Sequence, residues 1–279
     1  MLSDEAFLQA VFERPDEDAP RLVYADWLEE AGHTDRAEFI RLQCGGADPE
    51  REAELLRTFG AVWAEPISHQ VYCYAFRRGF VEEVTVNALS FLRLGESLFA
   101  AAPIRLARII GARLVMDRLC ASPWVARLGA LHLTGARIGD EGGRLLATSS
   151  HLRSLRTLRL GDNALGDDAI EELTSSNNFS ELQVLVLGDN QIKDDGAYLL
   201  ANCRAFPNLH TLDLRNNEIG AAGAEMLARA EWLKHLCHLD LSDQHKGATD
   251  LDHRERNLPI KLKQQRALAE RLGADAYVF

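Results

Sequence analysis

Residues 155–169 read LRTLRLGDNALGDDA, and residues 182–196, which begin 27 positions later, read LQVLVLGDNQIKDDG. Three more segments repeat this pattern at the same interval: LGALHLTGARIGDEG from Leu128, LHTLDLRNNEIGAAG from Leu209 and LCHLDLSDQHKG from Leu236. A fixed period of about 20 to 50 residues is typical of repeat architectures. It predicts an array in which each repeat buries its apolar face against its neighbours.

The spacing within a repeat predicts a short strand. Leu158 and Leu160 are two residues apart, so both side chains point to one face of that strand. An asparagine ends three of the strands at equivalent positions, Asn163, Asn190 and Asn217. A buried amide there can donate to carbonyls of one turn and accept from N–H groups of the next. We therefore predict a structural ladder of amides.

Tandem acids follow each strand, and they recur with the same period: Asp140-Glu141, Asp167-Asp168 and Asp194-Asp195. They stand where each repeat's helix is expected to begin. Acidic side chains there can cap free N–H groups and complement the helix dipole. This interpretation is favoured over metal binding.

The repeated pattern L-x-x-L-x-L-x-x-N-x-(I/L) resembles that of the leucine-rich repeat family, in particular its long, helix-containing ribonuclease-inhibitor type. The resemblance implies an α/β solenoid with parallel strands on one side and helices on the convex side. Weaker units occur at residues 81–86 and 104–109, so about seven strands are expected over residues 80–250. The pattern fails at Gln244 and Lys246. Residues 251–279 are predicted to be a C-terminal cap, with a helix from Pro259 and a last strand at AYVF.

The chain before the array has helical spacing of apolar residues over residues 3–13, 20–31 and 34–42. The stretches PRLVYADWLEE (20–30) and RAEFIRLQ (36–43) resemble a small repeat-companion domain of planctomycete and myxobacterial repeat proteins, for which no activity is implied. We expect residues 1–44 to form this all-helical domain and residues 45–79 a helical neck or N-terminal cap.

Two contacts are expected inside the motif of residues 20–30. Tyr24 and Trp27 are interpreted as core residues, with a peptide-binding patch as the alternative. Asp26 is expected to pair with Arg21 or Arg36.

The net charge is −11, and it is concentrated at one end. Residues 1–65 hold 16 Asp and Glu against 6 Arg, a balance of −10. Such a front would repel phosphate, so nucleic-acid binding is not expected. Apolar runs stay below about 18 residues, so no membrane span is predicted. The acidic start and five cysteines without a CxxC pair favour a cytoplasmic protein with reduced thiols. The resemblance of residues 1–44 to planctomycete and myxobacterial repeat proteins implies a bacterial protein.

Catalytic motifs are missing from the sequence. It has no GxSxG, HExxH, P-loop or GxGxxG motif after a strand. His235-Leu-Cys-His238 is the only His/Cys cluster, and alternation along a strand prevents three of its side chains from converging. Cys44 has no histidine within a few residues to activate it. We therefore predict no enzyme, no catalytic residue, no metal and no cofactor.

The strand positions that alternate with the leucines are expected to line the concave face of the solenoid. Val184 and Val186 lie among charged positions, an arrangement that suits a protein partner. The predicted partner-binding residues are His132, Arg159, Asp162, Val184, Val186, Asp189, Asp213, Arg215, Asn216, His238 and Asp240.

The leading functional hypothesis is a non-enzymatic interaction module or scaffold that binds a protein on the concave face and is monomeric alone. One alternative is an inhibitor or regulator that blocks a partner enzyme with the acidic strip of Asp213, Asp240 and Asp243. Another is a structural component of a larger assembly. An inhibitor should bind one-to-one with an on-rate that falls steeply with salt, whereas a structural component should self-associate or join something larger.

Overall fold

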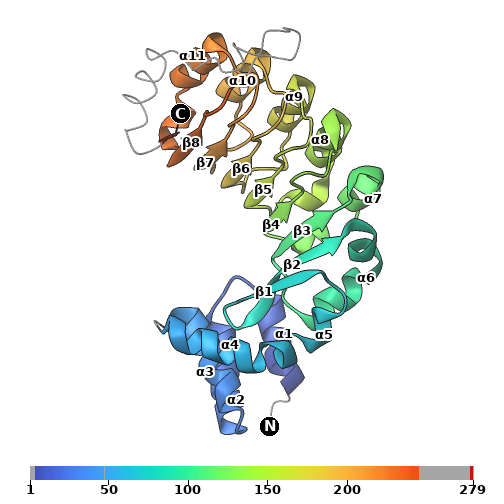
Figure 1. The fold of residues 1–279 in the computed structure, drawn as a ribbon, viewed down its shortest axis with the longest axis vertical. Coiled ribbons are helices and arrows are strands. Elements are labelled where there is room, and N and C mark those ends of the chain that lie inside the picture. The colour runs from blue at the N-terminus through green and yellow to red at the C-terminus, as the bar shows by residue number, and fades with distance from the viewer. Residues whose placement is uncertain (1–3, 47, 245–276, 279) are drawn as a thin grey trace. The chain divides into compact units, whose positions relative to one another are not determined.

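The computed structural model describes residues 4–46, 48–244 and 277–278 (Figure 1). The chain forms two compact units, Met1–Arg108 and Ile109–Phe279. The boundaries expected at residues 44 and 79 both lie inside the first unit, and the division of the chain into four segments stays a prediction. The helix expected from Pro259 lies outside the described residues.

The first unit begins with the three expected helices. In chain order its elements are α1 (Asp4–Glu13), α2 (Ala19–Glu30), α3 (Thr34–Gly45), α4 (Pro49–Trp63), α5 (Glu65–Ser68), β1 (Cys73–Arg77), β2 (Phe80–Asn87) and α6 (Ala88–Ala101). The strand β3 (Leu106–Ile110) contains the boundary between the units. Pro20 opens α2, and Gly32, at φ +88°, follows its end. Asp48 caps α4 by accepting from the N–H of Arg51 at 2.9 Å.

A β-hairpin in the first unit was not predicted from the sequence. β1 pairs with β2 in antiparallel fashion, and Arg78 and Gly79 connect them at φ of 50° and 88°. Two central residues with positive φ are typical of a type I′ turn, whose twist suits a two-residue hairpin. The expectation of a helical neck or N-terminal cap over residues 45–79 did not include the strand at residues 73–77, because five residues are too short a pattern to reveal one.

The core of the first unit joins the helices to this hairpin. Tyr24, Ala25, Leu28 and Ile40 form one buried cluster with Phe80 of β2, and Trp27 packs against it. The rings of Tyr24 and Trp27 stack at 5.9 Å. The interpretation of these aromatics as core residues is thus confirmed.

The ion pair expected for Asp26 was wrong in its partner. Arg41 contacts the Asp26 carboxylate at 2.7 Å, whereas Arg21 pairs with Glu82 at 2.6 Å. The Arg36 guanidinium instead lies over aromatic rings.

The second unit is the regular array. Its strands are β4 (Ala130–His132), β5 (Thr157–Arg159), β6 (Val184–Val186), β7 (Thr211–Asp213) and β8 (His238–Asp240). They pair in parallel, and each residue lies opposite the residue 27 positions later. A further strand, β9 (Tyr277–Val278), pairs with β8, as expected for the AYVF stretch. The seven predicted strand positions are occupied by β2 to β8.

Helices line the other side of the array. Up to residue 244 they are α7 (Met116–Cys120), α8 (Gly139–Thr148), α9 (Asp167–Ser175), α10 (Asp194–Asn202) and α11 (Ala221–Arg229). The same part of the chain has the 3-10 turns η1 (Arg113–Val115), η2 (Val125–Arg127), η3 (Ser150–Leu152) and η4 (Trp232–His235). Between the layers runs a column of leucines with at most 1% exposure: Leu131, Leu158, Leu185, Leu212 and Leu239. Figure 1 shows α8 to α11 along one side and β4 to β8 along the other. The predicted α/β leucine-rich repeat solenoid is confirmed.

Candidate functional site

The strand face is the side of β4 to β8 that points away from the helices. Strand pairing places its side chains in two rows that cross the sheet. The first row holds Ala130, Thr157, Val184, Thr211 and His238. The second row holds His132, Arg159, Val186, Asp213 and Asp240. The register therefore brings seven of the predicted binding residues onto one surface.

The side chains of the strand face differ widely in exposure. Val184 and His238 of the first row are half-buried. In the second row Arg159 is exposed, whereas the other members are only 8 or 9% exposed: His132, Val186, Asp213 and Asp240. Only part of the predicted set is thus available to a partner.

The remaining predicted residues lie just beyond the strands. Asp162, Asp189 and Asn216 stand at equivalent turn positions with φ of 54°, 60° and 48°. Asp and Asn tolerate this left-handed region better than other side chains with a Cβ, so the backbone alone accounts for their recurrence. Asn216 also donates to Asp189 at 2.5 Å. Asp162, Asp189 and the neighbouring Arg215 are exposed.

The acids of the second row are engaged within the array. Asp213 accepts from the N–H of Arg215 at 3.0 Å, and the Arg215 guanidinium lies 3.4 Å from its other oxygen. Asp240 accepts from both the N–H and the hydroxyl of Ser242. Burial raises the pKa of Asp213, and the nearby charges of Asp240 and Asp189 act in the same direction.

Arg159 differs from these neighbours. Its side chain makes no hydrogen bond or ion pair with any other residue that the structure describes, and it is exposed. Pairing with Val186 across β5 and β6 places it beside the apolar centre of the strand face. An arginine next to a shallow apolar patch is a common anchor in protein interfaces.

Amides run under the ends of the strands and join each repeat to the next. Asn190 accepts from the N–H groups of Asn163 and Leu165, both at 3.0 Å. It donates to carbonyls of its own repeat and the preceding one, those of Leu160, Leu187 and Gly188. Asn163 and Asn217 repeat the arrangement, with exposures of 0% and 1%. The side-chain oxygens and nitrogens of these buried amides are therefore all hydrogen-bonded.

Gln244 occupies the same place in the last repeat, although it breaks the sequence pattern. Its side-chain oxygen accepts from Ile219 at 3.0 Å, and its nitrogen donates to Leu214 at 2.7 Å. The longer glutamine side chain thus substitutes for asparagine at the end of the ladder.

The tandem acids cap helices, but not their own. Asp167, in the first turn of α9, accepts from Lys193 and Gly196 at the start of α10. Asp194 of α10 likewise accepts from Gly220 and Gly223 at the start of α11. The expected capping is confirmed for the first acid of each pair. Each carboxylate reaches the helix start of the next repeat, because stacking of the repeats places that start beside it.

Glycine is required at the second contact of this cap. A Cβ on Gly196 would lie 2.4 Å from the Asp167 oxygen. The equivalent position one repeat earlier is Ala169, and there Asp140 bonds only the N–H of Gly166. The two-contact cap is therefore confined to the later repeats.

We expect Asp194→Ala to lower the free energy of unfolding by about 1 kcal/mol, since a lost N-terminal cap costs about that much. Asp195→Ala is the matched control, because the adjacent acid is exposed and no hydrogen bond depends on it. Urea unfolding of both variants measures the difference. Equal midpoints for the two would contradict the assignment.

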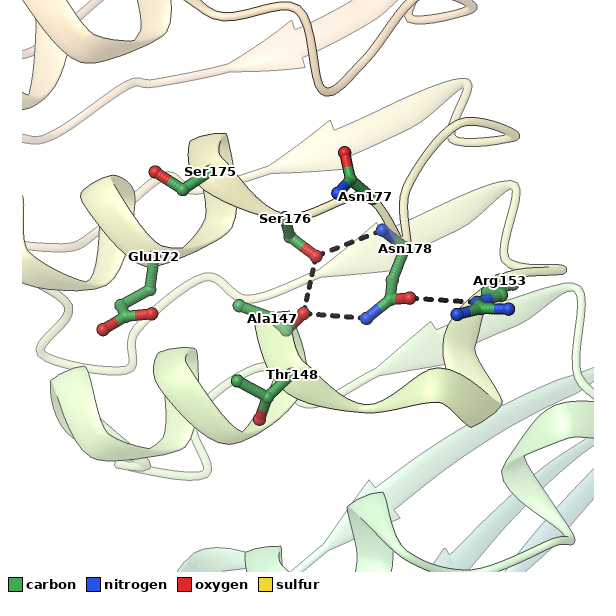
Figure 2. Close-up of a pocket in the computed structure, with 8 residues that line it drawn as sticks. All are labelled: Ala147, Thr148, Arg153, Glu172, Ser175, Ser176, Asn177 and Asn178. Carbon is green, nitrogen blue, oxygen red and sulfur yellow. Dashed lines mark hydrogen bonds between the residues drawn. The ribbon is translucent and has the colours of Figure 1, made fainter.

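A polar cleft of about 310 Å³ lies between the ends of α8 and α9 (Figure 2). Its floor is a hydrogen-bonded seam, in which the carbonyl of Ala147 accepts from Ser176 and Asn178. Asn178 in turn accepts from Arg153 at 3.1 Å. Four of the eight lining residues, Ala147, Arg153, Ser176 and Asn178, thus bond one another between adjacent repeats, and repeat stacking accounts for this seam. The recurrence of Ser149 and Ser176 at 27 residues was the sequence signal for this seam.

The described residues contain no group of three or more His, Cys, Asp or Glu side chains placed to hold a metal. Cys44 is half-buried, and burial raises the pKa of its thiol to about 11, so it is protonated at neutral pH. Among the helices that the structure describes, none has the length and apolar character needed to cross a bilayer.

Comparison with known proteins agrees with the geometry of the second unit. The family described as Leucine Rich repeat matches residues 128–147, 151–173, 181–201 and 207–228. This part of the chain is therefore an array of leucine-rich repeats.

No protein with a curated description matches the chain. Among solved structures, an internalin (inlF) from Listeria monocytogenes is similar, with 19% identity and a TM-score of 0.35. The match covers 57% of this chain and 48% of the internalin, so this chain spans about half of that protein's length.

Proposed function

We propose that the protein is a non-enzymatic interaction module that binds a protein partner on the strand face of its leucine-rich repeats. The assignment as an interaction module rests on the repeat array, because stacked repeats present an extended surface suited to protein binding. That the partner binds on the strand face is what we propose in addition. In the same proposal the protein is cytoplasmic, monomeric alone, and needs no cofactor.

The observation that carries the proposal is Arg159. It is an exposed cation without a partner in the described chain, and it lies beside Val184 and Val186. Arginine is enriched among residues that dominate interface energies, and apolar side chains at the centre of a patch favour desolvation. A partner would therefore place a carboxylate on Arg159 and an apolar group over Val184, which is half-buried, whereas Val186 is only 9% exposed.

Two of the three residues in the acidic strip of the inhibitor alternative are less available, whereas the third, Asp243, is exposed. Asp213 and Asp240 are each 8% exposed and bond the turns that follow them. Asp213 is also paired with Arg215. These contacts favour a scaffold over an inhibitor that presents these acids to a basic active site.

Affinity capture from the lysate of the source cell tests the proposal. We expect the wild-type protein to retain a partner that Arg159→Glu loses, because the charge reversal repels the partner's carboxylate. Arg144→Glu is the matched control: it makes the same charge change on α8 of the same unit, at an exposed residue paired only with Glu141. Equal retention by the two variants would place the binding site elsewhere.

A further inference from the structure

We propose that α1, α2 and α3 form the packing site for the tip of the β1–β2 hairpin, so that residues 4–45 and 73–87 unfold only together. The helical segment is then not a separate module but a clamp on the strands that follow it. This inference is independent of partner binding on the strand face. It rests on three sets of contacts within the first unit.

The first set holds the turn itself. Gln43 of α3 accepts from the N–H of Gly79 at 2.8 Å. A Cβ on Gly79 would lie 2.5 Å from Cγ1 of Ile40 and 2.9 Å from its Cα. With φ at +88°, Gly79 also has a backbone conformation that other residues rarely adopt. Only glycine therefore fits between α3 and the turn.

The second set is a buried ion cluster. Arg21 of α2 is 0% exposed, and it donates to the Glu82 carboxylate at 2.6 Å and to the carbonyl of Pro15 at 2.8 Å. Arg78 of the turn donates to the other oxygen of Glu82 and to the same carbonyl, both at 2.8 Å. Glu82 itself is 4% exposed. Moving the hairpin away from the helices would break the ion pair of Arg21 with Glu82 and the hydrogen bond from Arg78 to the carbonyl of Pro15.

The third set is aromatic. The Arg36 guanidinium lies 4.7 Å from the ring centre of Trp63 and 5.3 Å from that of Phe80. The Phe39 ring meets Phe76 of β1 edge-on at 5.4 Å. Burial lowers the pKa of Arg36 to about 10. The charge is thus held by ring faces that come from both the helices and the hairpin.

These contacts make the two segments thermodynamically dependent. The anion of Arg21 and two of the four rings around Arg36, Phe76 and Phe80, belong to the hairpin. The hairpin tip in turn packs against α3. Neither segment can expose its half of the interface without leaving charge or apolar surface uncompensated. The same coupling transmits any change on the helices to β1 and β2.

Hydrogen exchange of the full-length protein, resolved by peptide, tests this coupling. We expect Gly79→Ala to speed exchange at least tenfold in residues 4–45 and 73–87 by the same factor, with residues 128–228 unchanged. Gly45→Ala is the matched control, because its Cβ would meet nothing within 4 Å. Faster exchange in the hairpin alone would overturn the proposal.

A milder variant covers the case in which Gly79→Ala does not fold. Gln43→Met removes only the side-chain contacts of α3 with Gly79 and with Glu52. Equal acceleration of exchange in both segments supports the clamp. Acceleration limited to α3 and α4 would overturn it.

Discussion

An Asn190→Leu variant is expected to lose about 2–6 kcal/mol of unfolding free energy. The substitution leaves two buried N–H groups, those of Asn163 and Leu165, without an acceptor, and each such group costs about 1–3 kcal/mol. Carbonyls of Leu160, Leu187 and Gly188 lose a donor as well. Urea unfolding followed by far-ultraviolet circular dichroism measures the loss.

The matched control for this prediction is Asn177→Leu. Asn177 is exposed, one residue before a seam contact, and no hydrogen bond depends on its side chain. Its unfolding free energy should change by no more than about 0.5 kcal/mol, as is usual for surface substitutions. If both variants lost the same amount, the amide ladder would not be what holds the strand ends together.

The second large effect is expected at Glu82. Removing one member of a buried ion pair costs about 3–5 kcal/mol, so Glu82→Ala should destabilise the first unit by that amount. The Arg21→Met/Glu82→Leu double variant should recover most of the loss, because it leaves no buried cation behind. Thermal unfolding of the single and double variants measures both effects.

If the double variant were no more stable than Glu82→Ala, the loss of stability in Glu82→Ala would not arise from the unpaired charge of Arg21. A loss at Glu82 would then reflect packing of β2 alone. Arg78 also loses its ion pair when Glu82 is removed, but this costs less stability, because the Arg78 side chain is 25% exposed and remains solvated.

The period of 27 residues was enough to predict the array, because every repeat satisfies the same strand, turn and helix requirements. The spacing of apolar residues within a repeat also located β2 and β3, although they follow shorter intervals than 27 residues and lack the asparagines. It failed at β1, which belongs to no repeat. It also gave no warning that Gln244 would complete the ladder, because a longer side chain can reach the same backbone groups from a position that breaks the pattern.

Long-range contacts could not be predicted from spacing. Arg21 and Glu82 are 61 positions apart, and the sequence offered nearer acids such as Asp26. The cross-repeat caps were hidden for a related reason: Asp167 stands in its own helix start, and only stacking shows that its carboxylate points to the next one.

Alternation predicted which side chains share the strand face but not which of them are exposed. Arg159 and Asp213 occupy the same row, yet the Arg159 side chain is exposed, whereas Asp213 is buried, with 8% exposure. Their difference comes from neighbours in adjacent strands and turns, such as Arg215 over Asp213. The binding role of the predicted residues stays a prediction, with Arg159 now the residue on which it chiefly rests.

Binding on the strand face is tested most directly by the affinity of the captured partner for purified wild-type, Arg159→Glu and Arg144→Glu proteins, measured by titration calorimetry. Loss of an interface anchor of this kind costs about 2 kcal/mol or more, so we expect Arg159→Glu to raise Kd by a factor of at least about 30. Arg144→Glu should leave Kd within about twofold of the wild-type value. An unchanged Kd for the folded Arg159→Glu protein would contradict binding on the strand face.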